Sequence, residues 1–144
     1  MSKAIPWDSV VVGTNLGPVE TGITEKAVRN YCQDWDDPNP WHLEASPWGR
    51  PVAPPAFMAG LACFQLLSSR FDARATVGVK SEHENLAPLF VGQTMVTRGR
   101  IAEKYVKRGL EYVVIASESC DETGQLFRRG VDHILLSLER VDHD

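Results

Sequence analysis

Apolar side chains in the first half of the chain recur at the spacing of a helix. Ala27, Tyr31 and Trp35 lie four residues apart and predict a helix over about 25–35. Thr24 precedes this stripe and is a suitable N-cap, because its side-chain oxygen can accept a hydrogen bond from a free N–H of the first turn.

A second predicted helix begins at Pro54 and Pro55, because the first turn of a helix does not need the N–H that proline lacks. From there to Ser69 the chain carries no charge, and apolar residues occupy almost every side of the helix. Such a helix is expected to be buried on most sides. The uncharged run is shorter than the roughly 20 residues that cross a bilayer, so we expect no membrane association.

The second half of the chain is rich in β-branched and aromatic residues, which favour strands. Turn signals at Gly109 and residues 121–124 predict antiparallel hairpins, and Gly99 predicts a bulge or bend. A turn at residues 15–17 separates two shorter pieces near the N-terminus. The predicted strands are 9–13, 18–23, 76–84, 93–106, 109–120 and 126–138. A buried helix followed by long antiparallel strands predicts an α+β fold in which the sheet curls around the helix.

Length, composition and charge narrow the class of protein. The chain has 144 residues, 43% hydrophobic and 24% charged, which fits one globular domain over 1–144. A net charge of -4 argues against nucleic acid as the main partner. The chain has three cysteines, an odd number, and no C-x-x-C motif: Cys32, Cys63 and Cys120. Its first residues do not contain the apolar core of a signal peptide. We therefore expect free thiols and a cytoplasmic location.

The segment between the two predicted helices carries the candidate chemistry. Asp37, Asn39, Pro40 and His42 fit a D-x-N-P-x-H pattern. Two prolines in this segment stop the first helix, so we expect the carboxylate and the imidazole on a stiff irregular loop. Taken singly, Asp37 is an ordinary turn residue and His42 an ordinary loop histidine. Together, at this spacing, they favour acid–base catalysis.

This pattern resembles the signature of the MaoC-like (R)-specific enoyl-CoA hydratases of the hot-dog superfamily. The resemblance extends to the Gly49-Arg-Pro-Val-Ala53 entry into the central helix and to residues 88–94. It implies a hot-dog fold, an antiparallel sheet of about five strands wrapped around a long central helix. It also implies a hydro-lyase that adds water to a 2-enoyl thioester, or removes it, with Asp37 and His42 around one water. Which of the two is the base stays open.

The chain departs from the family where the central helix begins. Many hydratases have A-H-G-M there, and a backbone N–H polarises the thioester carbonyl. In this chain Pro55 occupies the position of that glycine, and proline has no N–H to donate. The resemblance therefore implies Ala56 or Phe57 as donor, and it places Cys63 at the family's helix hydroxyl.

Other side chains have a structural reading beside a functional one. Asn39 is expected to brace the loop. Trp35 and Trp41 suit an acyl pocket or ordinary packing equally well. The remaining histidines share no metal-ligand spacing, so we expect no metal. The basic residues between Arg98 and Arg108 suit a solvated strand face, or contact with coenzyme A phosphates.

Three functions remain open from the sequence. The first is the hydratase or dehydratase, with substrate carried as a coenzyme A or carrier-protein thioester, no cofactor, and assembly as a homodimer. The second is a hot-dog thioesterase. The third is a non-catalytic subunit that completes a two-part dehydratase with a partner hot-dog chain, which the Pro54-Pro55 entry resembles.

Overall fold

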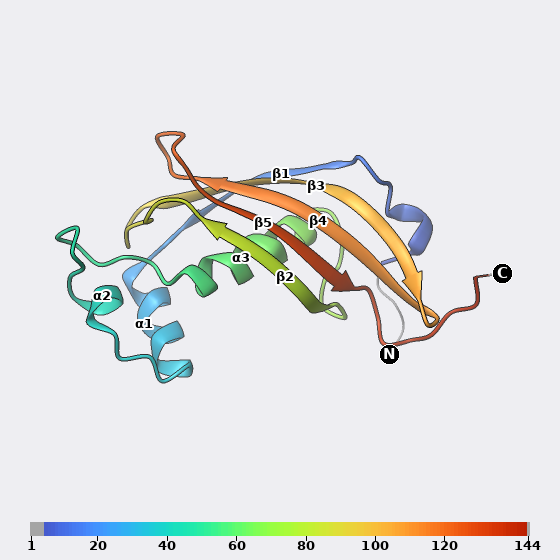
Figure 1. Ribbon diagram of the computed structural model, residues 1–144, viewed down its shortest axis with the longest axis horizontal. Coiled ribbons are helices and arrows are strands. Elements are labelled where there is room, and N and C mark those ends of the chain that lie inside the picture. Colours follow the sequence, from blue (N-terminus) through green and yellow to red (C-terminus); the bar gives the residue numbers. More distant parts are fainter. Residues whose placement is uncertain (1–4, 144) are drawn as a thin grey trace.

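The computed structural model describes residues 5–143, which contain one five-stranded antiparallel sheet with one helix lying against a face of it (Figure 1). The strand order is β1-β3-β4-β5-β2, so the first two strands of the sequence form the two edges. The helices are α1 (Glu25–Asp34), α2 (Pro40–Leu43) and α3 (Pro55–Ser68). The strands are β1 (Asn15–Gly22), β2 (Val77–Asn85), β3 (Thr94–Lys107), β4 (Leu110–Cys120) and β5 (Leu126–Leu135). The predicted antiparallel sheet of five strands is confirmed.

Local signals placed the helix starts correctly. Thr24 caps α1, and its Oγ1 accepts a hydrogen bond from the N–H of Ala27 at 3.1 Å. Helix α3 begins at Pro55, with Pro54 in the N-cap position. Both features are decided within one turn of helix, so the sequence is sufficient to predict them.

The predicted hairpin turns are also present. Arg108 and Gly109 join β3 to β4 and both have positive φ, 53° and 76°. Such a turn matches the twist of the strands it joins. Between β4 and β5, the Asp121 side chain accepts hydrogen bonds from the N–H groups of Thr123 and Gln125, at 2.8 and 3.1 Å.

The N-terminal prediction was wrong in two places. Residues 9–13 are not a strand, because Gly13 has a φ of 92° and the Thr14 N–H turns back to the Val11 carbonyl. Residues 15–17 are not a turn, because β1 runs through them along β3 with an irregularity in register between Leu16 and Val19. The pairing partner β3 overrides the local turn signal.

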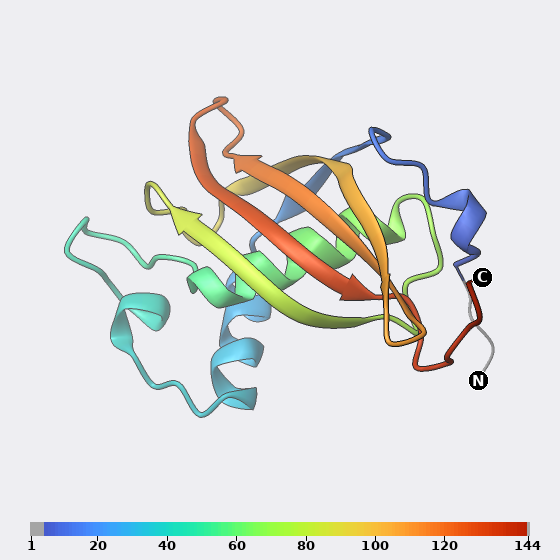
Figure 2. The ribbon, with the colours of Figure 1, turned by 45° about the vertical axis from the view of Figure 1, so that its right-hand side comes forward.

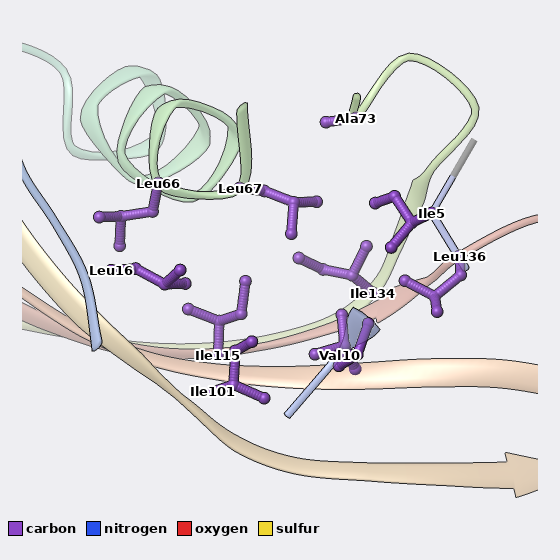
Figure 3. Packing of buried hydrophobic residues seen from close by; sticks show 11 residues of the cluster. Ile5, Val10, Leu16, Leu66, Leu67, Ala73, Ile101, Ile115, Ile134 and Leu136 are labelled. Atoms are coloured by element: carbon purple, nitrogen blue, oxygen red, sulfur yellow. The ribbon is translucent and has the colours of Figure 1, made fainter. Parts of the chain in front are cut away.

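Helix α3 packs against one face of the sheet, as Figures 2 and 3 show. Leu66 and Leu67 lie above Ile101, Ile115 and Ile134 from three neighbouring strands. All five are at most 3% exposed. This contact is the centre of the larger apolar cluster and fixes the height of α3 above the sheet.

Gly99, where we predicted a bulge or bend, lies at a register irregularity and also serves close packing. It pairs with Leu16, and the register of β1 against β3 shifts between Leu16 and Val19. A second irregularity, against β4, falls between Ile101 and Glu103. A Cβ on Gly99 would lie 2.8 Å from Leu66 Cδ1 and 2.8 Å from the Ala116 carbonyl oxygen. The glycine therefore lets α3 approach the sheet closely.

The outward side of α3 is less covered than predicted. Met58, Ala62 and Leu66 are buried, whereas Ala56 and Gly60 are exposed and Phe64 is 54% exposed. The helix has 14 residues. Within residues 5–143, no helix is long and apolar enough to span a membrane.

Candidate active site

The end of α1 positions Asp37. Asp36 has a φ of 50°, and this left-handed residue lets the Asp37 N–H return to the Cys32 carbonyl at 2.7 Å. The Asp37 carboxylate therefore stays close to the last turn of α1. Burial raises the pKa of Tyr31 and of Cys32, and the negative charge of Asp37 raises the pKa of both further.

His42 lies on a short helix and not on irregular chain as predicted. Asn39 caps α2, and its Oδ1 accepts a hydrogen bond from the Trp41 N–H at 3.0 Å. The Asn39 N–H in turn donates to Asp37 Oδ1 at 3.1 Å. Asn39 thus holds both halves of the pair, as expected of a bracing residue. Pro40 begins the helix because proline suits its first position.

The imidazole of His42 is fixed by one backbone contact. Its Nδ1 lies 2.8 Å from the Val52 carbonyl oxygen. Because a carbonyl oxygen can only accept, Nδ1 carries the proton and neutral His42 has its lone pair on Nε2. That Nε2 lies 3.9 Å from Asp37 Oδ2. The side chain of His42 is 11% exposed and that of Asp37 is 37% exposed.

A separation of 3.9 Å is too long for a direct hydrogen bond and suits a bridging water. The lone pair of His42 and the acceptor oxygens of Asp37 both require a donor, and a water molecule supplies two. The structure therefore brings the predicted pair together at a distance that one water molecule can bridge.

The first turn of α3 approaches the same region. The rings of Tyr31 and Phe57 lie 5.1 Å apart, which links the last turn of α1 to the start of α3. Met58 is the residue whose N–H bonds back to the Pro54 carbonyl, at 3.2 Å. The N–H groups of Ala56 and Phe57 precede it, and such groups have no partner within the helix.

The remaining predicted site residues lie elsewhere. Trp41 is 46% exposed, with its ring against Trp48 at a centroid distance of 6.4 Å. Trp35 is 72% exposed. Neither tryptophan lies in a core of this chain. Cys63 faces the charges of Asp132 and Arg128, and so belongs to a different group of side chains.

Sequence reasoning missed that second group, which lies between α3 and the sheet. His83 Nε2 on β2 lies 3.2 Å from Asp132 Oδ1 on β5. Ser81 Oγ donates to the same oxygen at 2.6 Å. The histidine and the aspartate are far apart in the sequence, and no local pattern signals their contact. No three His, Cys, Asp or Glu side chains in residues 5–143 are grouped to hold a metal ion.

Arg98, one of the basic residues of β3, lies in a row of alternating charge across the sheet. Arg98 pairs with Glu118, Glu118 with Arg129, and Arg129 with Glu84. All four residues are exposed. Because opposite charges on neighbouring strands stabilise a solvated face, this arrangement favours the structural reading for Arg98.

The model of a family described as FAS1-like, dehydratase domain region, matches residues 10–128. No curated protein sequence gives a significant match. The family match covers Asp37, His42 and the start of α3 together.

Solved structures share the fold at low sequence identity. The unliganded R-hydratase PhaJ1 from Pseudomonas aeruginosa is 18% identical, covering 98% of this chain and 91% of that one, with a TM-score of 0.78. The monoamine oxidase regulatory protein from Archaeoglobus is 18% identical over 97% of both chains, with a TM-score of 0.77. The HadBC (3R-hydroxyacyl-ACP dehydratase) complex from Mycobacterium tuberculosis is 20% identical, covering 86% and 96%, with a TM-score of 0.71.

Proposed function

Because the chain belongs to the FAS1-like dehydratase-region family and has the hot-dog fold of the MaoC-like (R)-hydratases, we propose that it is an acyl-thioester hydratase or dehydratase. The proposed reaction adds water to a 2-enoyl thioester or removes it from a 3-hydroxyacyl thioester. The observation that carries the proposal is the 3.9 Å separation of His42 Nε2 and Asp37 Oδ2. Neither group lies in direct contact with the other, so both can hold one water.

His42 is the proposed base in the hydration direction. Its Nδ1 is already committed to the Val52 carbonyl, so Nε2 is the nitrogen that can accept a proton. As the water oxygen forms its bond to Cβ, one water proton moves to Nε2. The electron pair of the C=C bond shifts toward the thioester carbonyl and forms an enolate.

Asp37 then supports the second half of the reaction. Its carboxylate, 3.9 Å from Nε2, stabilises the positive imidazolium. The imidazolium returns a proton to Cα as the enolate collapses, so the net change is one water added. Since one pair delivers both groups, they arrive on the same face of the double bond. Dehydration follows the same steps in reverse.

The enolate oxygen needs hydrogen-bond donors. The N–H groups of Ala56 and Phe57 are free of helix partners at the positive end of the α3 dipole. We propose that the thioester carbonyl binds there, because donors aimed at developing charge lower the barrier most. Each chemical step is served by protein groups, so the proposal needs no metal or redox cofactor. The acyl group is carried on coenzyme A or a carrier protein.

Edge strand β2 supports assembly with a second hot-dog chain. Among residues 5–143 it pairs only with β5, and Val77 and Val79 are 45% and 49% exposed. A long edge strand with exposed apolar side chains tends to pair with another chain. We propose a homodimer formed through β2. HadBC and the ChsH1-ChsH2 complex are assemblies of two different subunits, which keeps a distinct partner chain as the second candidate.

One assay separates the proposed function from its rivals. The purified protein is incubated with a trans-2-enoyl-coenzyme A while enoyl absorbance and free thiol are followed together. Loss of absorbance without thiol release supports the hydratase. Thiol release would instead indicate a thioesterase. A protein that is inert alone, but active after a co-purifying hot-dog subunit is added, with activity surviving Asp37→Asn, would be the non-catalytic half.

A further inference from the structure

A second buried group of polar side chains lies between α3 and the sheet. Asp132 on β5 accepts a hydrogen bond from Ser81 Oγ at 2.6 Å, and its Oδ1 lies 3.2 Å from His83 Nε2. Ser81 and Asp132 are direct cross-strand partners, so the pairing of β2 with β5 fixes the contact. The side chains of His83 and Asp132 are only 17% and 7% exposed. We call these three residues the β2–β5 polar cluster.

The cluster contains unused hydrogen-bonding capacity. Asp132 Oδ2 and His83 Nδ1 are buried without a hydrogen-bond partner among residues 5–143. An unpaired buried polar atom destabilises the fold, so such atoms require an explanation. In Asp132, Oδ1 accepts from Ser81, whereas Oδ2 has no hydrogen-bond partner in this part of the structure.

Space for a ligand adjoins the cluster. A groove of about 440 Å³ runs along α3, lined by Ala56, Gly60, Cys63 and Leu67 on the helix and by the three cluster residues on the strands. Its helix side is apolar, whereas its strand side carries the polar cluster beside Gly78 and Ile134. The groove thus suits a mostly apolar chain that carries a polar group.

The groove begins at the proposed carbonyl site. Ala56, whose N–H is a proposed oxyanion donor, lines one end, and Cys63 lines the groove beside Asp132. Seven residues of α-helix separate the two, a rise of about 10 Å. An acyl chain held at the Ala56 N–H and laid along α3 would therefore reach the cluster about 10 Å from its carbonyl.

The charges around the cluster indicate whether the polar group of a bound ligand is charged or neutral. The buried guanidinium of Arg128 donates to Ser119 and Ser117 at 2.8 and 2.7 Å, and its positive charge acts on Asp132. The Asp132 carboxylate would repel an anionic ligand group, and the Arg128 guanidinium would repel a cationic one. A neutral hydroxyl is repelled by neither charge. It can donate a hydrogen bond to Asp132 Oδ2 and accept one from an N–H or O–H group nearby.

Gly130 leaves room for this arrangement. A Cβ there would lie 2.5 Å from His83 Nδ1 and 2.7 Å from Arg128 Nη2. The absence of a side chain at this position in β5 lets the imidazole and the guanidinium approach one another under α3. The cluster is therefore built into the sheet and does not depend on a loop.

We propose that the β2–β5 polar cluster is a specificity site that binds a hydroxyl group on the acyl chain of the substrate, about 10 Å from the thioester carbonyl. This inference rests on the proposed function and narrows its substrate class to hydroxylated acyl thioesters. Asp132 accepts the hydrogen bond from the hydroxyl, while His83 and Ser81 hold the carboxylate in place.

The test measures binding, so that it does not depend on turnover. Saturated acyl-coenzyme A thioesters of one chain length, unsubstituted or with a single hydroxyl at successive positions, are titrated into the full-length protein by calorimetry. We expect one position to bind about tenfold more tightly than the unsubstituted chain, the effect of a hydrogen bond to a charged group. Asp132→Asn and Ser81→Ala are expected to reduce that preference while the affinity for the unsubstituted chain is retained.

Glu82→Gln is the matched control, because Glu82 lies on β2 between Ser81 and His83 but its side chain is 74% exposed. The preference should survive this change. Ser81→Ala removes a single hydroxyl and keeps the test usable if Asp132→Asn does not fold.

The outcomes separate this inference from the proposed function. Hydration of plain enoyl thioesters with no preference for any hydroxyl position overturns the specificity site alone. A hydroxyl preference that the Asp132 variant abolishes, in a protein that hydrates nothing, supports the site and overturns the proposed reaction. A preference unchanged in both variants, or no binding of any thioester, also overturns the site.

Discussion

Nδ1 of His42 lies 2.8 Å from the carbonyl oxygen of Val52, and this contact ties α2 to the segment that leads into α3. Val52 forms an isolated bridge with Phe90, next to the start of β3. The imidazole is therefore oriented by backbone that the sheet itself holds. This arrangement leaves Nε2 facing Asp37 and underlies the first prediction.

Asp37→Asn and His42→Ala are each expected to lower kcat/KM for enoyl-thioester hydration by about 10²–10⁴, the usual contribution of one acid–base group. Asn keeps the oxygen that accepts from the Asn39 N–H, so Asp37→Asn should leave the melting temperature nearly unchanged. Asp34→Asn, at an exposed carboxylate of α1, is the control and should retain full activity. Activity within threefold of wild type in Asp37→Asn would show that the Asp37 carboxylate does not stabilise the His42 imidazolium during the reaction.

We expect the buried thiol of Cys63 to lower the free energy of unfolding at alkaline pH. Burial and the Asp132 carboxylate raise the pKa of the Cys63 thiol from about 9 to about 12. Between these values the folded chain binds more protons than the unfolded chain, so the free energy of unfolding falls as the pH rises through this window. Urea titrations of wild type and Cys63→Ala from pH 9 upward isolate this contribution, because the other titrating groups are shared. Wild type should lose stability more steeply, and parallel slopes would show that the thiol does not titrate in this way.

Gly99→Ala is expected to lower the free energy of unfolding by about 1–3 kcal/mol, the usual cost of overpacking a core. The added methyl would meet Leu66 Cδ1 and a backbone oxygen of β4, each at 2.8 Å. Gly22→Ala is the matched control, since a Cβ there has no neighbour within 4 Å. Equal urea midpoints for the two variants would mean that α3 can move away from the sheet at little cost.

If the homodimer forms through β2, a charged substitution on that strand is expected to halve the mass of the particle in solution. Val79→Lys places a charge on the exposed edge and should convert a dimer to monomer in analytical ultracentrifugation. Val12→Lys is the control, because Val12 is 52% exposed, similar to Val79 at 49%, but lies outside the sheet. A dimer that persists in Val79→Lys would place the interface elsewhere.

The sequence by itself determined the features that depend on neighbouring residues. Thr24, Pro54 and Pro55 fixed the starts of two helices because capping is completed within one turn. Asp37 and His42 were recognisable as a candidate pair because the D-x-N-P-x-H pattern resembles a hydratase signature and lies on a short segment with two prolines.

Only the tertiary structure decided the contacts that depend on strand pairing and on the position of α3. Ser81 and His83 meet Asp132 because β2 and β5 are paired in one particular register. Gly99 is a packing position because Leu66 reaches it from a helix distant in sequence. Such contacts depend on the register of the whole sheet, where a shift of one residue would turn each side chain to the opposite face. The local pattern of residues does not predict this register.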